Sequence, residues 1–149
     1  MATFPMKLYL DSCALGRQHD DQTNLRIRNE ADAVTRILDL EDFMFSSDML
    51  VDEFEAIRNQ EKRASLLALL AAADGHISVT PNIAARGTEL AALGFGSKDA
   101  IHLACAESAQ ADWFLTTDDQ LLRCARRNSG TLKVKVENPA AWVLRFATP

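Results

Sequence analysis

The chain has 149 residues, of which 48% are hydrophobic and 25% are charged, and its formal net charge is −5. A disordered chain would combine lower hydrophobicity with higher net charge, so the composition predicts one compact domain over residues 1–149. The negative charge speaks against broad electrostatic binding of nucleic acid, although an acidic protein can still hold a basic groove.

The first third of the chain alternates between short apolar runs and an amphipathic stretch. Residues 6–10 (MKLYL) form an apolar run that ends at Asp11, which predicts a buried strand. The polar residues 18–24 predict a loop, and residues 25–40 carry apolar side chains at helical spacing. Residues 43–46 (FMFS) predict a second strand.

The middle third predicts helices around one strand. Ser47 or Asp48 is suited to cap a helix that runs to about residue 58, and the Ala- and Leu-rich residues 61–73 predict another helix. Residues 76–80 alternate in polarity, which predicts a strand. Pro81 begins the next helix, because a proline in the first helical turn loses no hydrogen bond.

The last third predicts a helix capped by Ser97, a strand, a helix, a strand and a final helix. The first helix and the first strand span residues 98–110 and 113–116. Asp118 or Asp119 begins the next helix, which runs to residue 127, and the last two elements span residues 132–136 and 139–146. Alternating strands and helices predict an α/β fold, with a parallel sheet covered on both faces in one three-layer α/β/α domain. Ligands of such sheets bind beyond the carboxyl ends of the strands, so residues that follow strands are candidates for a site.

The cysteines and the apolar runs predict the compartment. Cys13, Cys105 and Cys124 form no CxxC pair, which argues against a structural zinc site and for reduced thiols. The sequence has no apolar signal core near its start and no apolar run long enough to span a bilayer. We therefore expect a cytoplasmic protein with no membrane partner.

Carboxylates follow several of the predicted strands. Asp11 ends the first strand, Glu53 lies one helical turn after the second, and Asp118 follows the strand at 113–116. Asp99 lies in the first turn of its helix, so all four acids can converge at one sheet edge. Like charges at short range raise one another's pKa unless a cation such as Mg²⁺ or Mn²⁺ neutralises them. Two such ions about 4 Å apart can clamp the attacking and leaving oxygens of a phosphodiester.

Each acid also has a structural interpretation. An Asp at a helix start commonly caps the helix, and this is the favoured interpretation of Asp99 or Asp118 taken alone. For Asp11 the two interpretations are even, because an acid directly after a buried strand needs a partner. Glu53 taken alone is a solvated helix residue with two neighbouring acids as rivals.

Four segments, taken in order, resemble the PIN-domain family of nucleases, which includes the VapC-like toxin ribonucleases. LYLDSCAL at 8–15 resembles the family's opening strand and first acid, and MLVDEFEAI at 49–57 is similar to the segment with its helical Glu. Residues 94–122 are the most specific match, because they hold the D-A-x-H-x-A helix and then a strand ending in T-x-D. Asn138-Pro139 after the last strand also fits.

The resemblance implies a PIN fold, with a central parallel sheet of about five strands, and an Mg²⁺- or Mn²⁺-dependent endoribonuclease that cleaves RNA phosphodiester bonds. The catalytic acids would be Asp11, Glu53, Asp99 and Asp118. Asp11, Asp99 and Asp118 would hold the metal, and Glu53 would be a ligand or a base that orients water. Asp119 extends the cluster, but the T-x-D spacing favours Asp118. Many small PIN proteins are toxins, so the resemblance also implies an antitoxin protein as partner and a homodimer.

Three further residues are candidates for supporting roles. The hydroxyls of Ser12 and Thr116 can bond a water or a phosphate near the acids, or serve as caps. His102 lies three residues after Asp99, close to the same face of its helix, where packing or orientation of a neighbour is favoured over acid catalysis.

The candidates for RNA binding are basic. Arg17 lies near the first acid, and Arg123, Arg126 and Arg127 follow the last one. A run of charges is commonly a solvated helix face, whereas contacts to phosphates would make the affinity fall steeply with salt.

Two other classes of function compete with the nuclease. A phosphotransfer fold also places an Asp after its first strand, but a haloacid-dehalogenase-type phosphatase needs a second Asp where Cys13 stands. A response-regulator receiver needs paired acids and a late Lys, which we do not find. The remaining alternative is a non-catalytic PIN-fold module that binds nucleic acid or protein, and the complete set of acids weighs against it.

Overall fold

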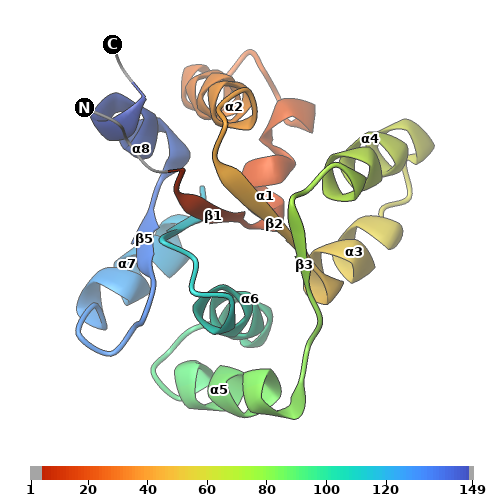
Figure 1. Ribbon diagram of the computed structural model, residues 1–149. Coiled ribbons are helices and arrows are strands. Elements are labelled where there is room, and N and C mark those ends of the chain that lie inside the picture. Colours follow the sequence, from red (N-terminus) through yellow and green to blue (C-terminus); the bar gives the residue numbers. More distant parts are fainter. Residues whose placement is uncertain (1–4, 148–149) are drawn as a thin grey trace.

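The centre of the molecule is a parallel sheet of five strands in the order β3-β2-β1-β4-β5 (Figure 1). The computed structural model describes residues 5–147, so residues 1–4 and 148–149 of the predicted domain lie outside the described residues. The strands are β1 (Lys7–Leu10), β2 (Phe43–Ser47), β3 (Gly75–Ile77), β4 (Trp113–Leu115) and β5 (Lys135–Glu137). The predicted α/β class and the parallel sheet of about five strands are confirmed.

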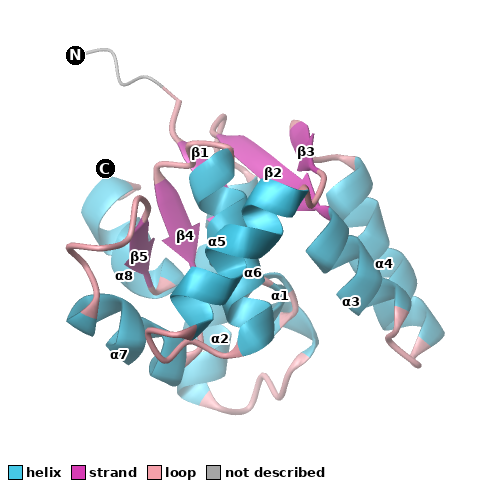
Figure 2. Ribbon diagram, turned by 90° about the horizontal axis from the view of Figure 1, so that it is seen from below, coloured by secondary structure: helices cyan, strands magenta, loops and turns pink. Residues whose placement is uncertain are grey.

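Helices cover both faces of this sheet. Figure 1 shows α1, α2 and α8 on one face and α5, α6 and α7 on the other, while α3 and α4 pack together beside β2 and β3. Figure 2 gives the same layers from below. The helices are α1 (Ser12–Leu15), α2 (Leu25–Leu38), α3 (Asp48–Glu55), α4 (Gln60–Ala71), α5 (Pro81–Ala91), α6 (Ser97–Ser108), α7 (Asp119–Arg127) and α8 (Pro139–Phe146), with a 3₁₀ turn, η1, at Arg17–His19.

The core lies on both faces of the two central strands. Leu8, Tyr9 and Leu10 of β1 are fully buried, because helices cover both sides of a parallel sheet and leave no solvated face. The Tyr9 ring stacks on Phe114 of β4 with a centroid distance of 5.3 Å. Each such buried side chain contributes roughly 1.5–3 kcal/mol from the removal of apolar surface from water.

The strand order reverses its direction between β1 and β4. From β1 the chain adds β2 and then β3 on one side, and it later returns to place β4 and β5 on the other side. Leu10 is in register with Leu115, and the backbone N–H of Asp11 donates to the carbonyl of Leu115 at 3.1 Å. A reversal of this kind leaves a crevice beyond the carboxyl ends of the two strands, where open α/β sheets bind ligands.

Several local features differ from the sequence-based expectations, and the strand predicted at residues 76–80 is one of them, because β3 ends at Ile77. The chain turns into α1 and η1 directly after β1, whereas no helix was expected before residue 25. The last strand begins at Lys135 instead of residue 132. The residue that caps α6 is Gly96, which offers no side-chain bond, and Ser97 is already inside the helix. Among the helices of residues 5–147, none combines the length and the apolar character needed to cross a bilayer.

Candidate active site

Asp11 lies at the crevice between β1 and β4 and is 2% exposed. Its carboxylate caps α1 by accepting a hydrogen bond from the N–H of Ala14 at 2.9 Å. Burial raises the pKa of this carboxyl to about 6, although hydrogen bonds from the Thr116 hydroxyl and the Ala14 N–H act in the opposite direction. The charge of Asp99 raises the pKa further, which places that second acid close by.

Thr116 joins Asp11 to Asp118 and gives the T-x-D spacing a physical reason. Its hydroxyl donates to the Asp11 carboxylate and accepts from the backbone N–H of Asp118 at 3.1 Å. The Asp118 carboxylate caps α7 by accepting from the N–H groups of Gln120 and Leu121 at 2.9 and 3.2 Å. The threonine that follows β4 therefore fixes the backbone that presents the next acid.

Asp118 and Asp119 have different partners. The Asp119 carboxylate forms a two-pronged ion pair with the Arg26 guanidinium, at 2.8 and 2.7 Å, and both side chains are about half exposed. The charge of Asp118 raises the pKa of Asp99, whereas Asp119 has no such effect on it. Asp118 is thus the neighbour of the other acids, while Asp119 links α7 to α2.

Asp99 enters the site from α6 on the opposite side of the sheet from α1. The loop before this helix turns at Gly94, whose φ of +112° is a conformation that side chains rarely adopt. Burial raises the pKa of Asp99, and the charges of Asp118 and Glu53 raise it further, partly offset by His102. Asp118 and Glu53 are therefore near enough to Asp99 for their charges to disfavour its ionised form.

Glu53 differs from Asp11 and Asp99 because its pKa is lowered. Its half-burial on α3 acts to raise the pKa, but hydrogen bonds from His102 and from the Ser12 hydroxyl outweigh that effect. His102 Nε2 lies 2.5 Å from Glu53 Oε1. Glu53 is thus held in its ionised form by two neighbours that the sequence analysis named as supporting residues.

A buried line of hydrogen bonds runs behind Glu53. The Tyr9 hydroxyl lies 2.6 Å from His102 Nδ1 and 2.7 Å from the Ser47 hydroxyl. Burial raises the pKa of Tyr9 well above its usual range, so the phenol keeps its proton. We infer that Ser47 donates to Tyr9, Tyr9 to His102 Nδ1, and His102 Nε2 to Glu53, because each group then has one donor and one acceptor role.

The pKa of the Cys13 thiol is affected by all four acids. The Cys13 side chain lies at the rim of the site, directly after Ser12 in α1. Partial burial of the thiol and the negative charges of Asp11, Asp118, Asp99 and Glu53 together raise its pKa to about 12. The four sequence-predicted acids, which come from four separate parts of the chain, therefore all lie close enough to Cys13 to act on its thiol.

The chemistry of these donors suits a hard divalent cation. Carboxylate oxygens are the ligands that Mg²⁺ and Mn²⁺ prefer, and a cation would relieve the repulsion that raises the pKa values of Asp11 and Asp99. Within residues 5–147, no three His, Cys, Asp or Glu side chains already stand at the spacing of a finished metal site. The acids fit such an ion by the type of their donor atoms.

The predicted RNA-binding arginines divide into two kinds. Arg17 lines a hollow of about 430 Å³ beside Glu53 and Asp118, but its guanidinium is engaged by Glu30 at 2.8 Å and by Asp20 at 3.1 Å. By contrast, Arg123, Arg126 and Arg127 are exposed on α7 and form no ion pair among the described residues. Of these four predicted arginines, the three on α7 therefore have guanidinium groups without an ion pair in residues 5–147.

The residues that lie behind the acids are not predicted by the sequence patterns. Those patterns assign Tyr9 to a strand and Ser47 to a possible helix cap, and they do not single out Glu30. Tyr9 carried one signal, because the hydroxyl of a tyrosine in a buried strand needs a partner. Glu30 is 2% exposed and binds Arg17, Arg26 and Asn138 from three elements, which no local pattern announces.

Comparison with proteins of known structure finds the same fold in toxin–antitoxin complexes. VapBC2 of Rickettsia felis, bound to a DNA fragment from its promoter, matches with 12% identity and a TM-score of 0.53, over 89% of this chain and 98% of that one. VapBC-5 of Mycobacterium tuberculosis, a member of the VapBC family of toxin–antitoxin systems, matches with 18% identity and a TM-score of 0.54, over 90% of this chain and 99% of that one. VapBC-1 of nontypeable Haemophilus influenzae matches with 14% identity and a TM-score of 0.56, over 90% of this chain and 98% of that one.

Searches by sequence add the family. A search of curated proteins gives no match. Residues 9–127 match the PIN domain, a stretch that contains all four acids and most of the chain. The chain belongs to the PIN domain family.

Proposed function

We propose that this protein is a metal-dependent endoribonuclease whose catalytic residues are Asp11, Glu53, Asp99 and Asp118. The observation that supports the proposal is that these carboxylates, which lie just after β1, on α3, on α6 and in the β4–α7 turn, all raise the pKa of the Cys13 thiol. Structural caps alone would not require four acids to approach one another, since mutual repulsion costs free energy.

The acids would divide the work according to their surroundings. Asp11, Asp99 and Asp118 would hold one or two divalent ions, because they share the crevice, where the charge of Asp99 acts on Asp11 and the charge of Asp118 acts on Asp99. Glu53 is held in its ionised form, so its carboxylate is suited to orient the attacking water and accept its proton. His102 and Ser12 would fix the direction in which that carboxylate points.

A bound Mg²⁺ or Mn²⁺ would supply charge neutralisation and Lewis-acid polarisation of the phosphodiester. The protein would contribute position: the crevice fixes the acids on a rigid sheet edge before the substrate arrives. Thr116 has a part in this, because it holds the Asp11 carboxylate and the Asp118 backbone at once.

We further propose that the protein is the toxin of a toxin–antitoxin pair. Support comes from membership in the PIN family and from the three VapBC complexes of the same fold. Expression of the intact protein should then arrest growth, and expression with a small protein encoded beside it should restore growth. Harmless expression of an active enzyme would remove the toxin part of the proposal and leave the nuclease part.

The decisive test is cleavage of single-stranded and structured RNA by purified protein with Mg²⁺, with Mn²⁺ and with EDTA. Asp11→Asn should lose the metal-dependent cleavage. The matched control is Asp32→Asn, the same change at an exposed residue of α2 that forms no ion pair in the described chain, and it should keep full activity. Retained cleavage in Asp11→Asn would overturn the proposal, and binding of RNA without any turnover would select the non-catalytic module.

A further inference from the structure

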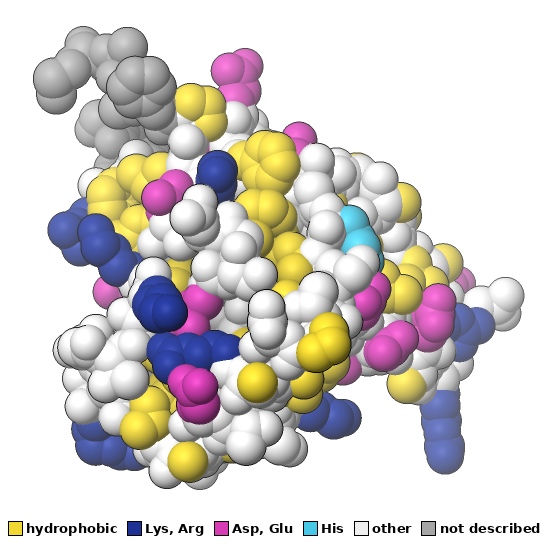
Figure 3. Space-filling model, turned by 60° about the horizontal axis from the view of Figure 1, so that its bottom comes forward, with side chains coloured by type: hydrophobic (Ala, Val, Ile, Leu, Met, Phe, Trp, Pro, Cys, Tyr) yellow, Lys and Arg dark blue, Asp and Glu magenta, His cyan; other side chains and the backbone are white. Residues whose placement is uncertain are grey.

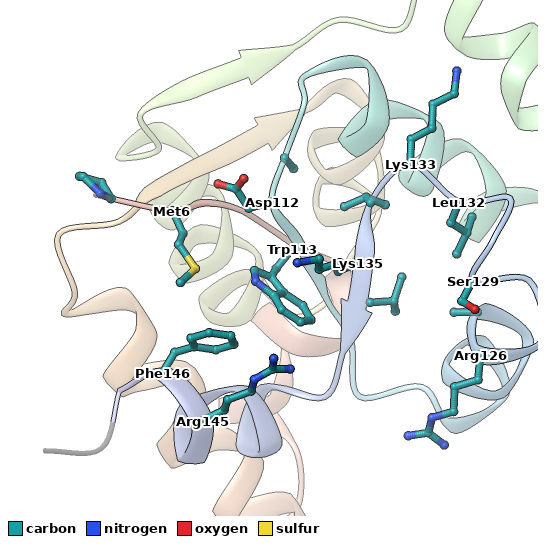
Figure 4. A pocket seen from close by; sticks show the side chains of 15 residues that line it. Met6, Asp112, Trp113, Arg126, Ser129, Leu132, Lys133, Lys135, Arg145 and Phe146 are labelled. Carbon is teal, nitrogen blue, oxygen red and sulfur yellow. The ribbon is translucent and has the colours of Figure 1, made fainter. Parts of the chain in front are cut away.

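A second site lies at the other end of the sheet from the acids. A hollow of about 920 Å³ is bounded by the first residues of β4 and β5 and by the last turns of α7 and α8 (Figure 4). Trp113 begins β4 and Lys135 begins β5, so the hollow is at the amino ends of these strands. The acids follow the carboxyl ends, and none of them lines it.

Basic side chains converge on this hollow. Arg126, Lys133, Lys135 and Arg145 line it and are all exposed, and none forms an ion pair within the described part of the chain. The one acid in the lining, Asp112, already accepts a hydrogen bond from the backbone N–H of Lys7 at 2.7 Å. Figure 3 shows basic side chains gathered at the left of the face it presents, next to exposed apolar side chains. We define these four cations as the basic pocket.

An aromatic floor lies beneath two of these cations. Lys135 Nζ is 5.4 Å and the Arg145 guanidinium is 5.7 Å from the centroid of the Trp113 ring. Arg145 is also 4.9 Å from the Phe146 ring, and Figure 4 shows Phe146 and Met6 beside the indole. The pocket thus offers cations for anionic groups and an apolar wall for flat or apolar groups.

Favourable interaction with a helix dipole explains the presence of only two of the four cations in the basic pocket. Arg126 and Arg145 lie in the last turns of α7 and α8, where a cation is favoured by the helix dipole. Lys133 and Lys135 lie in a loop and at the start of a strand, where no helix end calls for a cation. Two more cations beside a pair of arginines raise the repulsion, which an anionic ligand would relieve.

Helix α7 connects the basic pocket with the acids. It follows directly after its cap Asp118 and ends beside the pocket, a length of about 13 Å for its nine residues. Arg123 and Arg126 are exposed and three residues apart, so they lie on one face of this helix. Cations therefore extend from the active-site end of α7 to the pocket.

We propose that the basic pocket binds single-stranded RNA beyond the cleaved bond, a role that rests on the ribonuclease function proposed above. The phosphates would lie along Arg123 and Arg126 and reach Lys135 and Arg145, and a base would contact Phe146 at the pocket wall. An acidic protein segment would match the charge of the pocket alone, but the row of cations leading to the acids fits a strand that occupies both sites.

The test is the salt dependence of RNA binding, measured by fluorescence anisotropy in EDTA so that no RNA is cut. The pocket variant is Lys135→Gln with Arg145→Gln. The control variant is Arg28→Gln with Arg58→Gln, which has the same net charge and changes two exposed arginines whose side chains make no hydrogen bond or ion pair in residues 5–147. Each protein is titrated with a long single-stranded RNA and with a tetranucleotide.

For the long RNA, the slope of log affinity against log salt should fall by about 1.4 in the pocket variant, since each lost phosphate contact on a single strand removes about 0.7. The control should keep the original slope, and the tetranucleotide should bind all three proteins equally. Equal slopes for the pocket and control variants would overturn the proposal, as would displacement of the long RNA by polyglutamate as efficiently as by unlabelled RNA. If the protein binds RNA in this way but never cleaves it, the ribonuclease function fails while the pocket assignment stands.

Discussion

The two ends of the sheet carry opposite charges, and they differ in how those charges are held. At the carboxyl ends, Asp11 and Glu53 are fixed by hydrogen bonds from buried or half-buried neighbours, so their positions are set before a ligand arrives. At the amino ends, Lys135 and Arg145 are exposed and form cation–π contacts with the Trp113 ring, and neither has a carboxylate partner among the described residues. Chemistry needs fixed groups, whereas a grip on a flexible strand tolerates mobile ones.

The largest effect should come from removing one fixed acid. Asp11→Asn keeps an oxygen that can accept from the Ala14 N–H, so the α1 cap survives while the charge is lost. Cleavage should fall by more than the roughly 100-fold that loss of an outer partner of a metal ligand can cause. Single-turnover rates with Mn²⁺ would measure this, and a loss of less than that size would remove Asp11 from the ligand set.

The same substitution should alter stability as a function of pH. The folded pKa of Asp11, about 6, lies above its ordinary value of 3.8, so the folded protein binds this proton more tightly than the unfolded chain does. Stability from this group is fully present below about pH 4 and is lost as the pH rises through 6, by about 3 kcal/mol in total.

Chemical denaturation of the metal-free protein between pH 4 and 7.5 would measure that loss. The Asp11→Asn variant should show a smaller decline by about this amount, because its side chain does not ionise. Asp32→Asn is again the control. An identical pH profile for the wild-type protein and Asp11→Asn would contradict the assigned burial cost.

An intermediate effect should follow from loosening Glu53. His102→Ala removes the group 2.5 Å from Glu53 Oε1, and we expect activity to fall about 10- to 100-fold, as is usual for the outer partners of metal ligands. Imidazole added to the buffer should restore part of the rate if His102 acts by positioning Glu53. Tyr9→Phe leaves the His102–Glu53 contact in place and should cost less. Equal losses in both variants without rescue would indicate general destabilisation instead.

The smallest effect should separate two adjacent acids. Asp119→Asn weakens an exposed pair with Arg26, so the cleavage rate should change by no more than about fivefold, in line with other surface ion pairs. Asp118→Asn should cause a loss comparable to that of Asp11→Asn. A larger loss of cleavage rate in Asp119→Asn than in Asp118→Asn would show that Asp119, and not Asp118, belongs to the catalytic site.

The sequence predicted the sheet well because its signals were local. Short apolar runs such as MKLYL and WFLT mark buried strands, and Pro81 and Pro139 mark helix starts. The position of the acids after strands then predicted which end of the sheet to inspect. The short helix α1 was missed because Asp11, read as a candidate metal ligand, also caps that helix.

The supporting groups and the basic pocket were beyond local patterns. Tyr9, His102 and Ser47 meet across 38 and 93 positions of sequence, so only the folded chain brings them into a line. The pocket likewise joins residues from β4, β5, α7 and α8. Arg126 was predicted as an RNA contact from its charge alone, but Lys135 and Arg145 gave no such signal in a chain with net charge −5.

The contacts of Glu30 bear on how much of the chain must be translated before the site can form. Glu30 fixes Arg17 at the rim of the crevice, yet it also accepts from Asn138 at 2.6 Å, a residue 108 positions later. β1 likewise gains β4 as its second neighbour only after residue 113 has been added. A ribosome that has made two thirds of the chain therefore carries three of the four acids without the strand that brings the fourth beside them. If the proposed cleavage activity is correct, we expect a chain still under synthesis to be harmless to the RNA around it, and the activity to arise only when translation is almost complete.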